Sequence, residues 1–298
     1  VGFSRISVNP SLSIIYELNY AWRFTAHASY KERYGEMTDL YDRPYQTDYR
    51  NSVWNCGILP VYRQQLYSVY GEYKNTAREF FATVNLTHNR EWYNRIYEQR
   101  IENGQIQRVS LPLSNHGSGY TVKSTLSKGF YDLGLKTSFL ALLNISKAEQ
   151  ISGGQRLPYQ YRLMRLEPKV IWTPNRHWET SYQTDIRYGG NKIGERTRLA
   201  PLWNVTQQVQ LSYIFSPIEA SLSVDHYHND VNEDQSVNAV FADFSVLWKS
   251  RRWQITATAT NLFDKRTYAY TRYASLESYT SWVHIRPREF LVAIRYQL

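Results

Sequence analysis

The 298-residue sequence contains no run of about 18 or more apolar residues, which a membrane-spanning helix needs. Transmembrane helices are therefore excluded, and the mean hydropathy of −0.56 agrees with that exclusion. A membrane-spanning β-barrel is not excluded, because only every second residue of each strand has to face lipid. Hydrophobic residues make up 42% of the chain, which is enough for strands of this alternating kind.

Cysteine is almost missing, because Cys56 is the only one. A single cysteine forms no internal disulfide and no cysteine-based metal site. Basic blocks are missing too, although the net charge is +9, since Lys and Arg are scattered along the chain. Without a basic block interleaved with stacking aromatic residues, no nucleic-acid partner is expected. Residues 1–4 begin without Met, and no charged segment followed by an apolar stretch comes after them, so no signal peptide is expected.

Catalytic patterns are also missing from the sequence. No G-x-S-x-G nucleophile motif occurs, so nothing places a serine beside a histidine and an acid. His226 and His228 lie two residues apart and could bind one metal ion from one strand face. Only Asp225 and Asp230 are near enough in sequence to add further ligands. We expect no catalytic residues, no metal site, no cofactor and no enzyme activity.

Aromatic residues are abundant, at 15% of the chain, and Tyr alone accounts for 26 residues. Tyr and Trp favour the boundary between membrane and water, where an apolar ring and a polar tip are both accommodated. Trp172 and Trp178 flank one short turn, and Trp248 and Trp253 flank another. The pattern predicts an aromatic girdle beside these turns. The alternative is a Tyr-rich soluble β-sandwich.

The strongest positive signal is an alternation of apolar and polar residues that recurs along the whole chain. It is cleanest in residues 218–225 and 253–260, and another long apolar face occupies residues 133–145. Side chains alternate across a β-strand, so each segment has one apolar and one polar face. Sandwich strands usually run for about 5–6 residues. Several segments here run for about 12 or more, as tilted membrane-spanning strands do.

The links between these segments alternate between short and long, which predicts antiparallel strands in up-and-down order. Short turns on one side and long loops on the other are typical of outer-membrane barrels, and the short turns are periplasmic. About thirteen strands are expected, at residues 3–18, 21–34, 61–74, 77–99, 106–128, 130–147, 158–174, 176–190, 197–216, 217–231, 236–250, 251–269 and 279–298. The long links are expected at 35–60, 100–106, 148–158, 190–197, 231–236 and 270–279.

An odd number of strands cannot close into a regular antiparallel barrel, because the first and last strands run the same way. An open edge in lipid would leave a row of unpaired backbone groups. We therefore expect residues 1–298 to be the C-terminal part of a longer barrel whose first strands lie upstream.

The end of the chain resembles the end of TonB-dependent outer-membrane receptors. Residues 253–268 read WQITATATNLFDKRTY, and residues 286–298 read RPREFLVAIRYQL. In that family, a strand ending in N-L-F-(D/N)-K-x-Y precedes a loop, then P-R and a final alternating strand. The family usually closes with an aromatic residue, whereas this chain closes with Leu298. The residues that carry the match most clearly are Asn261, Leu262, Phe263, Pro287 and Arg288.

The stretch Met37–Tyr41, the residues from Asn51 onwards and the stretch Tyr67–Tyr73 look like Bacteroidetes-type receptors of this class. The resemblance implies a transmembrane barrel of 22 strands, of which this chain supplies the last thirteen. It also implies a signal peptide and a plug domain that are absent here. A receptor of this kind imports a scarce nutrient, such as a siderophore, haem, cobalamin, a glycan or a peptide.

The implied location is the cell outer membrane, and the implied partners follow from it. They are outer-membrane lipid, the TonB complex acting through the absent plug, the barrel-assembly machinery acting through the last strand, and a possible surface lipoprotein. The alternative function is a passive porin-like channel or an adhesin. The link at 35–60 is the expected substrate-contacting loop, because loops on a rigid scaffold carry recognition. Its candidate residues are Tyr41, Arg43, Tyr45, Tyr49 and Trp54.

Overall fold

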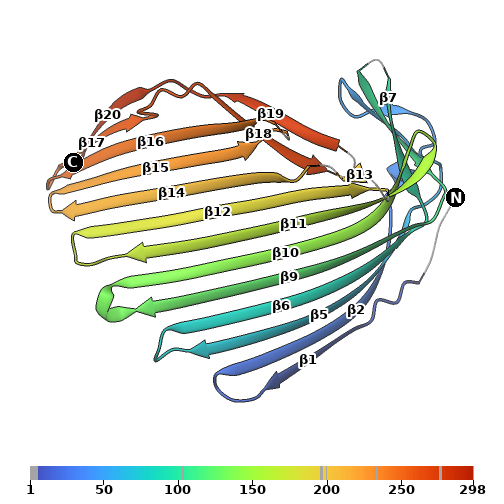
Figure 1. Cartoon of the computed structure of the whole chain (residues 1–298), viewed down its shortest axis with the longest axis horizontal. Coiled ribbons are helices and arrows are strands. Elements are labelled where there is room, and N and C mark those ends of the chain that lie inside the picture. The colour runs from blue at the N-terminus through green and yellow to red at the C-terminus, as the bar shows by residue number, and fades with distance from the viewer. Residues whose placement is uncertain are drawn as a thin grey trace.

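Within the described residues, thirteen strands form one curved antiparallel wall in up-and-down order (Figure 1). The computed structural model describes residues 6–102, 104–194, 197–198, 200–232, 234–274 and 277–297. No helix in these ranges is long and apolar enough to cross a membrane. The wall strands are β1 (Ser11–Glu17), β2 (Trp22–Tyr34), β5 (Val61–Asn75), β6 (Phe80–Tyr93), β9 (Asn115–Phe130), β10 (Leu135–Ser152), β11 (Gln155–Trp172), β12 (Trp178–Ile193), β14 (Leu202–Phe215), β15 (Ile218–Asp230), β16 (Ser236–Lys249), β17 (Trp253–Thr260) and β20 (Glu289–Tyr296).

The register between neighbouring strands brings their apolar positions onto one side of the wall, which we call the apolar face. Val69 of β5 lies opposite Leu86 of β6, Leu86 lies opposite Val122 of β9, and Val122 lies opposite Leu143 of β10. The same pairing continues at the far end, where Ala257 of β17 faces Val292 of β20. Because side chains alternate with a period of two, one register error would move a whole strand's apolar set to the other face.

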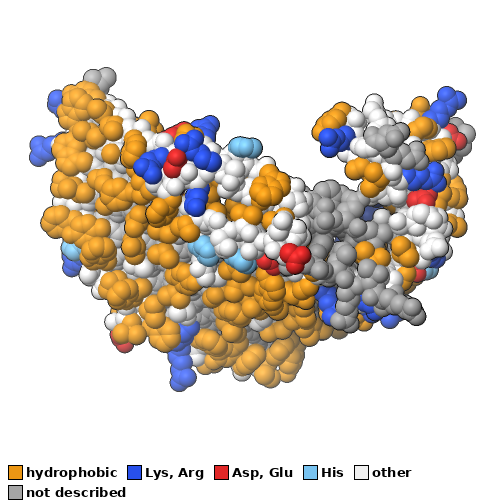
Figure 2. All heavy atoms as spheres, turned by 45° about the horizontal axis from the view of Figure 1, so that its top comes forward, with side chains coloured by type: hydrophobic (Ala, Val, Ile, Leu, Met, Phe, Trp, Pro, Cys, Tyr) orange, Lys and Arg blue, Asp and Glu red, His pale blue; other side chains and the backbone are white. Residues whose placement is uncertain are grey.

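The apolar face is exposed rather than buried. Val69 is 53% exposed, Leu86 is 49% exposed and Val292 is 65% exposed. Figure 2 shows large areas of hydrophobic side chains with no charged side chain among them. Soluble monomers rarely expose apolar surface on this scale, so the face needs an apolar partner. This observation argues against the soluble sandwich.

The height of the apolar face matches a membrane. On β10 the apolar positions run from Leu135 to Ile145, and strands rise about 3.3 Å per residue. With the usual tilt of about 35–45°, this gives roughly 25 Å, which is the height of the apolar band of outer-membrane barrels. The four girdle tryptophans lie on this face beside the short turns, and all four are exposed. The ring of Trp178 contacts that of Tyr213 at a tilt, and the ring of Trp253 contacts that of Tyr296 in the same way, each with centroids 4.7 Å apart.

The opposite side of the wall, the polar face, carries hydrogen-bonding and charged residues. Asp185 of β12 accepts hydrogen bonds from Arg165 Nε at 3.0 Å and from Arg187 Nη2 at 2.6 Å. Thr83 and Thr125 share a hydrogen bond between their hydroxyl groups at 2.5 Å. These groups satisfy one another along the face that a barrel turns to its interior.

The number of wall strands agrees with the prediction, but four of the predicted strands are divided. Predicted strands 77–99 and 106–128 leave the wall near the long-loop end, where β7 (Ile96–Glu102) and β8 (Gln105–Leu111) form a separate hairpin. Predicted strands 251–269 and 279–298 divide in the same way around the hairpin of β18 (Thr267–Ala274) and β19 (Glu277–His284). Leu298 lies outside the described residues.

Asn94 explains the first break. Its side-chain oxygen accepts a hydrogen bond from the Val61 backbone at 2.8 Å, and its side-chain nitrogen donates one to the Leu59 carbonyl at 2.9 Å. A side chain that takes over backbone partners offers the chain an alternative to the strand ladder. The chain can therefore turn away from β5 after Asn94 without leaving those groups unpaired.

The predicted long link at 148–158 is wrong. β10 and β11 stay paired as far as Ser152 and Gln155, and only Gly153 and Gly154 form the turn. Both glycines have positive φ, at 57° and 75°. Two consecutive residues with positive φ make the tight hairpin turn that matches strand twist, and glycine adopts them without steric cost. Because the ends of both strands are polar, the sequence pattern predicted a loop there and not a continuous hairpin.

The Asn-Leu-Phe-Asp motif forms a hydrogen-bonded turn at the end of β17. Asn261 has a φ of 51° and is only 6% exposed. Its side-chain nitrogen donates to the carbonyls of Lys265 at 2.8 Å and Arg286 at 2.9 Å, and its side-chain oxygen accepts from the Lys265 backbone at 2.9 Å. Asp264 accepts a hydrogen bond from the Arg288 backbone at 3.0 Å. The motif thus ties together the two ends of the 261–288 link.

Short links complete the described chain. They are the 3₁₀ helices η1 (Met37–Leu40) and η2 (Tyr131–Leu133) and the strands β3 (Tyr45–Gln46), β4 (Asn51–Trp54) and β13 (Thr197–Arg198). Within the described residues, β1 pairs only with β2, and β20 pairs only with β17. Each of these two strands therefore presents one unpaired edge.

Replacing Phe139 with Arg should test which face meets lipid. Phe139 lies near the middle of the apolar positions of β10, and an arginine at the bilayer midplane costs roughly 2–4 kcal/mol of unfolding free energy. The neighbouring Ser138 is also exposed but points to the polar face, so Ser138→Arg is the matched control. Urea unfolding in lipid vesicles should show the loss for Phe139→Arg alone. Equal losses for both variants would contradict the assignment of the faces.

Asn261→Ala should lower the free energy of unfolding by roughly 2–4 kcal/mol, because it removes buried hydrogen bonds and because alanine tolerates a positive φ less well than asparagine. Asn261→Gly keeps the backbone conformation but not the hydrogen bonds, so it should recover about 1 kcal/mol of that loss. Denaturant titration of the refolded protein measures both changes. If the two variants were as stable as the parent, the motif would have no structural role.

Candidate functional site

The longer links gather at one end of the wall, opposite the short turns (Figure 1). Two of them fold back as hairpins on the polar face or beside it. The hairpin β18–β19 packs on the polar face, where Asn229 of β15 donates a hydrogen bond to the Ala269 carbonyl at 3.2 Å. Tyr227 of β15 also contacts Tyr268, with ring centroids 5.3 Å apart. The hairpin β7–β8 lies at the same end, next to β4 and β10.

A cavity of about 720 Å³ lies between the hairpin β7–β8 and the polar face at this end. Its floor comes from the ends of β6, β9, β10 and β11, and its opposite side comes from β4, β7 and β8. The residues on which the argument below depends are Glu91, Tyr93, Arg95, Tyr97, Arg108 and Tyr159. A volume of this size suits a small-molecule ligand.

Glu91 organises the floor of the cavity. One carboxylate oxygen accepts hydrogen bonds from the Tyr62 hydroxyl at 3.2 Å, from Gln64 at 3.2 Å and from Asn89 at 2.8 Å. The other oxygen accepts one from the Tyr93 hydroxyl at 2.9 Å. A carboxylate with four hydrogen-bond donors is held in one orientation. Its role in this arrangement is to fix the two tyrosine rings.

Two arginines stack on Tyr97 at the side of the cavity. The guanidinium of Arg108 lies 3.7 Å from the ring centroid, and that of Arg95 lies 5.0 Å from it. Arg95 also donates to Asp39 at 2.9 Å, so its charge is balanced. Arg108 is exposed and has no ion-pair partner among the described residues. Burial raises the pKa of the Tyr97 hydroxyl, so the ring stays neutral. Arg108 therefore offers an available positive charge to the cavity.

Glu98 anchors the hairpin to the wall. It is 5% exposed, and it accepts hydrogen bonds from Arg100 Nη2 at 2.7 Å and from the Gly154 backbone at 3.0 Å. The hydrogen bond from Arg100 lowers the pKa of the Glu98 carboxyl, so the anchor stays charged at neutral pH. The cavity wall is thus held against the turn between β10 and β11.

The five predicted loop residues lie on the 35–60 link, but none of them lines this cavity. Tyr41 and Tyr45 contact each other edge to face, with centroids 6.1 Å apart. Trp54 donates a hydrogen bond to the Asp42 carbonyl at 3.0 Å. Tyr49 is 78% exposed, and Arg43 is exposed as well. The same link reaches the cavity through other residues, which are Thr47, Asp48, Asn51, Ser52 and Val53. Contact between the five residues and a substrate stays a prediction.

Sequence reasoning missed the cavity residues because it placed residues 77–99 and 106–128 in two uninterrupted wall strands. A signal was present, since Asn103-Gly104 is the dipeptide that most strongly favours a two-residue hairpin turn. A hairpin predicted at residues 96–111 from this dipeptide would have placed Tyr97 and Arg108 outside the wall strands. The stacking of both arginines on one ring depends on pairing across that hairpin and could not be read from spacing.

The histidine pair does not assemble a larger cluster. His228 hydrogen-bonds Asn238 at 2.9 Å and lies 3.4 Å from Asp230. Among the described residues, no group of three or more His, Cys, Asp or Glu side chains could hold a metal ion.

Comparisons with known proteins bear on the fold. No protein-family model matches the sequence, and no curated protein matches it. The ferric yersiniabactin uptake receptor FyuA of Yersinia pestis has a similar structure, with a TM-score of 0.50 and 7% identity over 97% of this chain. The P. aeruginosa receptor FpvA bound to pyoverdines gives a TM-score of 0.49 with 10% identity over 97% of this chain. The Pseudomonas putida toluene transporter TodX gives a TM-score of 0.27 with 11% identity, covering 97% of this chain and 82% of its own.

This chain spans 50% of the length of FyuA and 44% of that of FpvA. The similarity to FyuA, together with the apolar face and the up-and-down strand order, establishes the fold. The chain has the fold of an outer-membrane β-barrel wall.

Proposed function

We propose that this chain forms part of the barrel of a TonB-dependent outer-membrane receptor that imports a scarce nutrient. The observation that carries the proposal is the cavity of about 720 Å³ at the long-loop end of the polar face. A ligand that arrives from outside would meet this cavity before entering the barrel interior. Aromatic rings and hydrogen-bonding groups line it, and Arg108 adds a positive charge. Such a lining suits a polar, flat or anionic ligand.

The proposed receptor includes further strands, a plug domain and partner proteins. A complete receptor would have 22 strands, with this chain as the C-terminal portion of a Bacteroidetes-type protein. The unpaired edges of β1 and β20 support this, since lipid-exposed edges are not tolerated in a membrane. The plug and the TonB complex would drive import, the last strand would engage the barrel-assembly machinery, and a surface lipoprotein could cover the mouth. The ligand would cross without chemical change.

Arg108 and Tyr97 indicate the chemistry of the substrate. An exposed arginine on a tyrosine ring favours carboxylate, phosphate or hydroxamate-like oxygens, because guanidinium groups bind such oxygens in a bidentate manner. Siderophores, haem, cobalamin, acidic glycans and peptides all carry groups of this kind.

Arg108→Gln should weaken ligand binding by roughly 10–100-fold, because a hydrogen bond to a charged group contributes about 1.5–3 kcal/mol. The test is a titration of the purified full-length protein with ferric siderophores, haem, cobalamin, oligosaccharides and peptides, followed by tryptophan fluorescence. Arg176→Gln makes the same charge change in a short turn at the other end of the wall and should bind normally. If no ligand binds, or if the two variants behave alike, this cavity is not the binding site.

Uptake into cells separates the receptor from a passive channel or an adhesin. Import by a TonB-dependent receptor should stop when a protonophore collapses the inner-membrane potential, while surface binding remains. A porin-like channel would continue to equilibrate small solutes, and an adhesin would bind without any uptake. Continued import in the presence of the protonophore would overturn the proposal.

A further inference from the structure

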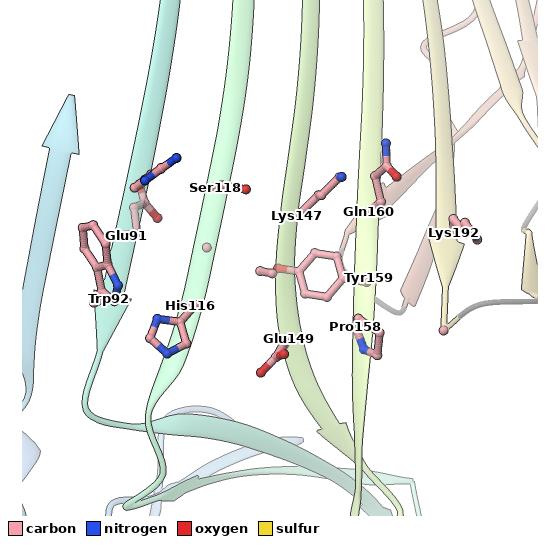
Figure 3. A pocket seen from close by; sticks show the side chains of 14 residues that line it. Glu91, Trp92, His116, Ser118, Lys147, Glu149, Pro158, Tyr159, Gln160 and Lys192 are labelled. Carbon is pink, nitrogen blue, oxygen red and sulfur yellow. The ribbon is translucent and has the colours of Figure 1, made fainter. Parts of the chain in front are cut away.

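A row of cations crosses five neighbouring strands on the outer side of the wall, just beyond the apolar positions. Arg90 of β6 lies opposite Ser118 of β9, and Ser118 lies opposite Lys147 of β10. Lys147 lies opposite Gln160 of β11, and Gln160 lies opposite Lys192 of β12. We call this set the basic row. Figure 3 shows Ser118, Lys147, Gln160 and Lys192 at one level on consecutive strands.

The period of two fixes the side of the wall on which the basic row lies. Lys147 is two residues beyond Ile145 on β10, and Arg90 is two residues beyond His88 on β6, so both share a side with the apolar face. The row therefore lies outside the barrel, at the end where the long loops gather. It borders a recess of about 440 Å³ on the wall.

The charges of the basic row are available. Within the described residues, no carboxylate lies within ion-pair distance of Arg90, Lys147 or Lys192, and Arg90 hydrogen-bonds only His88 at 3.3 Å. The acid in the recess that lies on the same side is Glu149, and Arg156 pairs with it at 3.1 Å. Strand spacing of about 4.8 Å places the three cations about 10 Å apart, with a neutral hydrogen-bonding side chain between each pair.

Directly below Arg90 and Ser118 lies a short aromatic row on β5, β6 and β9. His88 stacks on Tyr120 with ring centroids 4.2 Å apart and on Tyr67 at 6.4 Å. Further down, below Arg90 and Ser118, lies an apolar groove of about 550 Å³ that extends from β9 across β6 to β1, and its lining includes Leu86 and Val122. Aromatic residues with polar tips lie at the level of lipid headgroups, and acyl chains lie below them. Arg162 adds a fourth cation at the level of this aromatic row.

We propose that the basic row, Arg90–Ser118–Lys147–Gln160–Lys192, is a binding surface for the phosphate-bearing headgroup of an outer-leaflet lipid. Phosphate oxygens would receive charge-assisted hydrogen bonds from the three cations, with Ser118 and Gln160 as neutral donors between them. The acyl chains of the same lipid would lie along the apolar groove below Arg90 and Ser118 and along the apolar positions of β10 beside it. The register that aligns the three cations on alternate strands, with the aromatic row and the groove below the β6 and β9 end, distinguishes this surface from scattered surface lysines.

The test titrates the purified full-length protein, in neutral detergent, with lipid A and with the same lipid after removal of both phosphates. Native mass spectrometry reads the bound lipid. A cation near an anionic headgroup contributes roughly a five-fold change in affinity, so the triple variant R90Q/K147Q/K192Q should bind lipid A on the order of 100-fold more weakly. The dephosphorylated lipid should bind the parent protein about as weakly.

Two control variants make the result specific. K31Q/K123Q/K136Q removes three exposed cations from the polar face, with the same change in net charge, and should bind lipid A normally. R90K/K147R/K192R keeps the charges and should stay within about three-fold of the parent, which also shows that changes at these positions permit folding. Excess inorganic phosphate should not displace the lipid. Unchanged binding by the glutamine triple variant, equal loss in the polar-face control, or displacement by inorganic phosphate would overturn the proposal.

Discussion

Backbone hydrogen bonding between neighbouring strands constrains every other feature of this wall. In lipid no water can replace a missing partner, so each spanning strand has to pair along its length. This pairing continues between β10 and β11 beyond the apolar positions, as far as Gly153 and Gly154, although the strand ends are polar. It also fixes the register, and the register in turn decides which side chains share a face. A continuous apolar face and a continuous polar face are consequences of pairing in one consistent register.

The apolar face and the polar face end in different groups of residues at the long-loop end of the wall. The apolar face ends in aromatic residues and then in the basic row, an order that follows the change from acyl chains to headgroups. The polar face ends in the cavity, where Glu91 fixes two tyrosine rings and Arg108 stacks on Tyr97. Because adjacent residues of β6 serve opposite faces, Arg90 contributes to the outside and Glu91 to the cavity. If both proposals hold, a single strand end contributes to both a lipid-binding surface and a ligand-binding surface.

Alternation and turn length were sufficient to predict the fold class and the thirteen wall strands, because both are local properties of the sequence. The hairpins could not be placed in this way, since a strand that leaves the wall keeps the same alternation as one that stays. The chain leaves the wall at Asn94, whose side chain makes hydrogen bonds with Leu59 and Val61, and these two residues are distant from it in sequence. The cavity forms only because the hairpin β7–β8 leaves the wall, so the sequence did not predict its residues. Tyr49 and Arg43 were predicted as contact residues only because their loop is rich in aromatic and polar residues. The Asn261 motif was found by resemblance, and its hydrogen bonds explain why those residue types stand there.

The central claim is that the apolar face meets lipid while the polar face does not. It is tested most directly by single cysteines placed at each of positions 137–146 of β10, in a Cys56→Ser background, with nitroxide labels in lipid vesicles. Collision rates with a lipid-soluble and a water-soluble relaxing agent should alternate in opposite phase with a period of two, with odd positions in lipid. A uniform profile along the strand, or lipid contact at the even positions, would contradict the account.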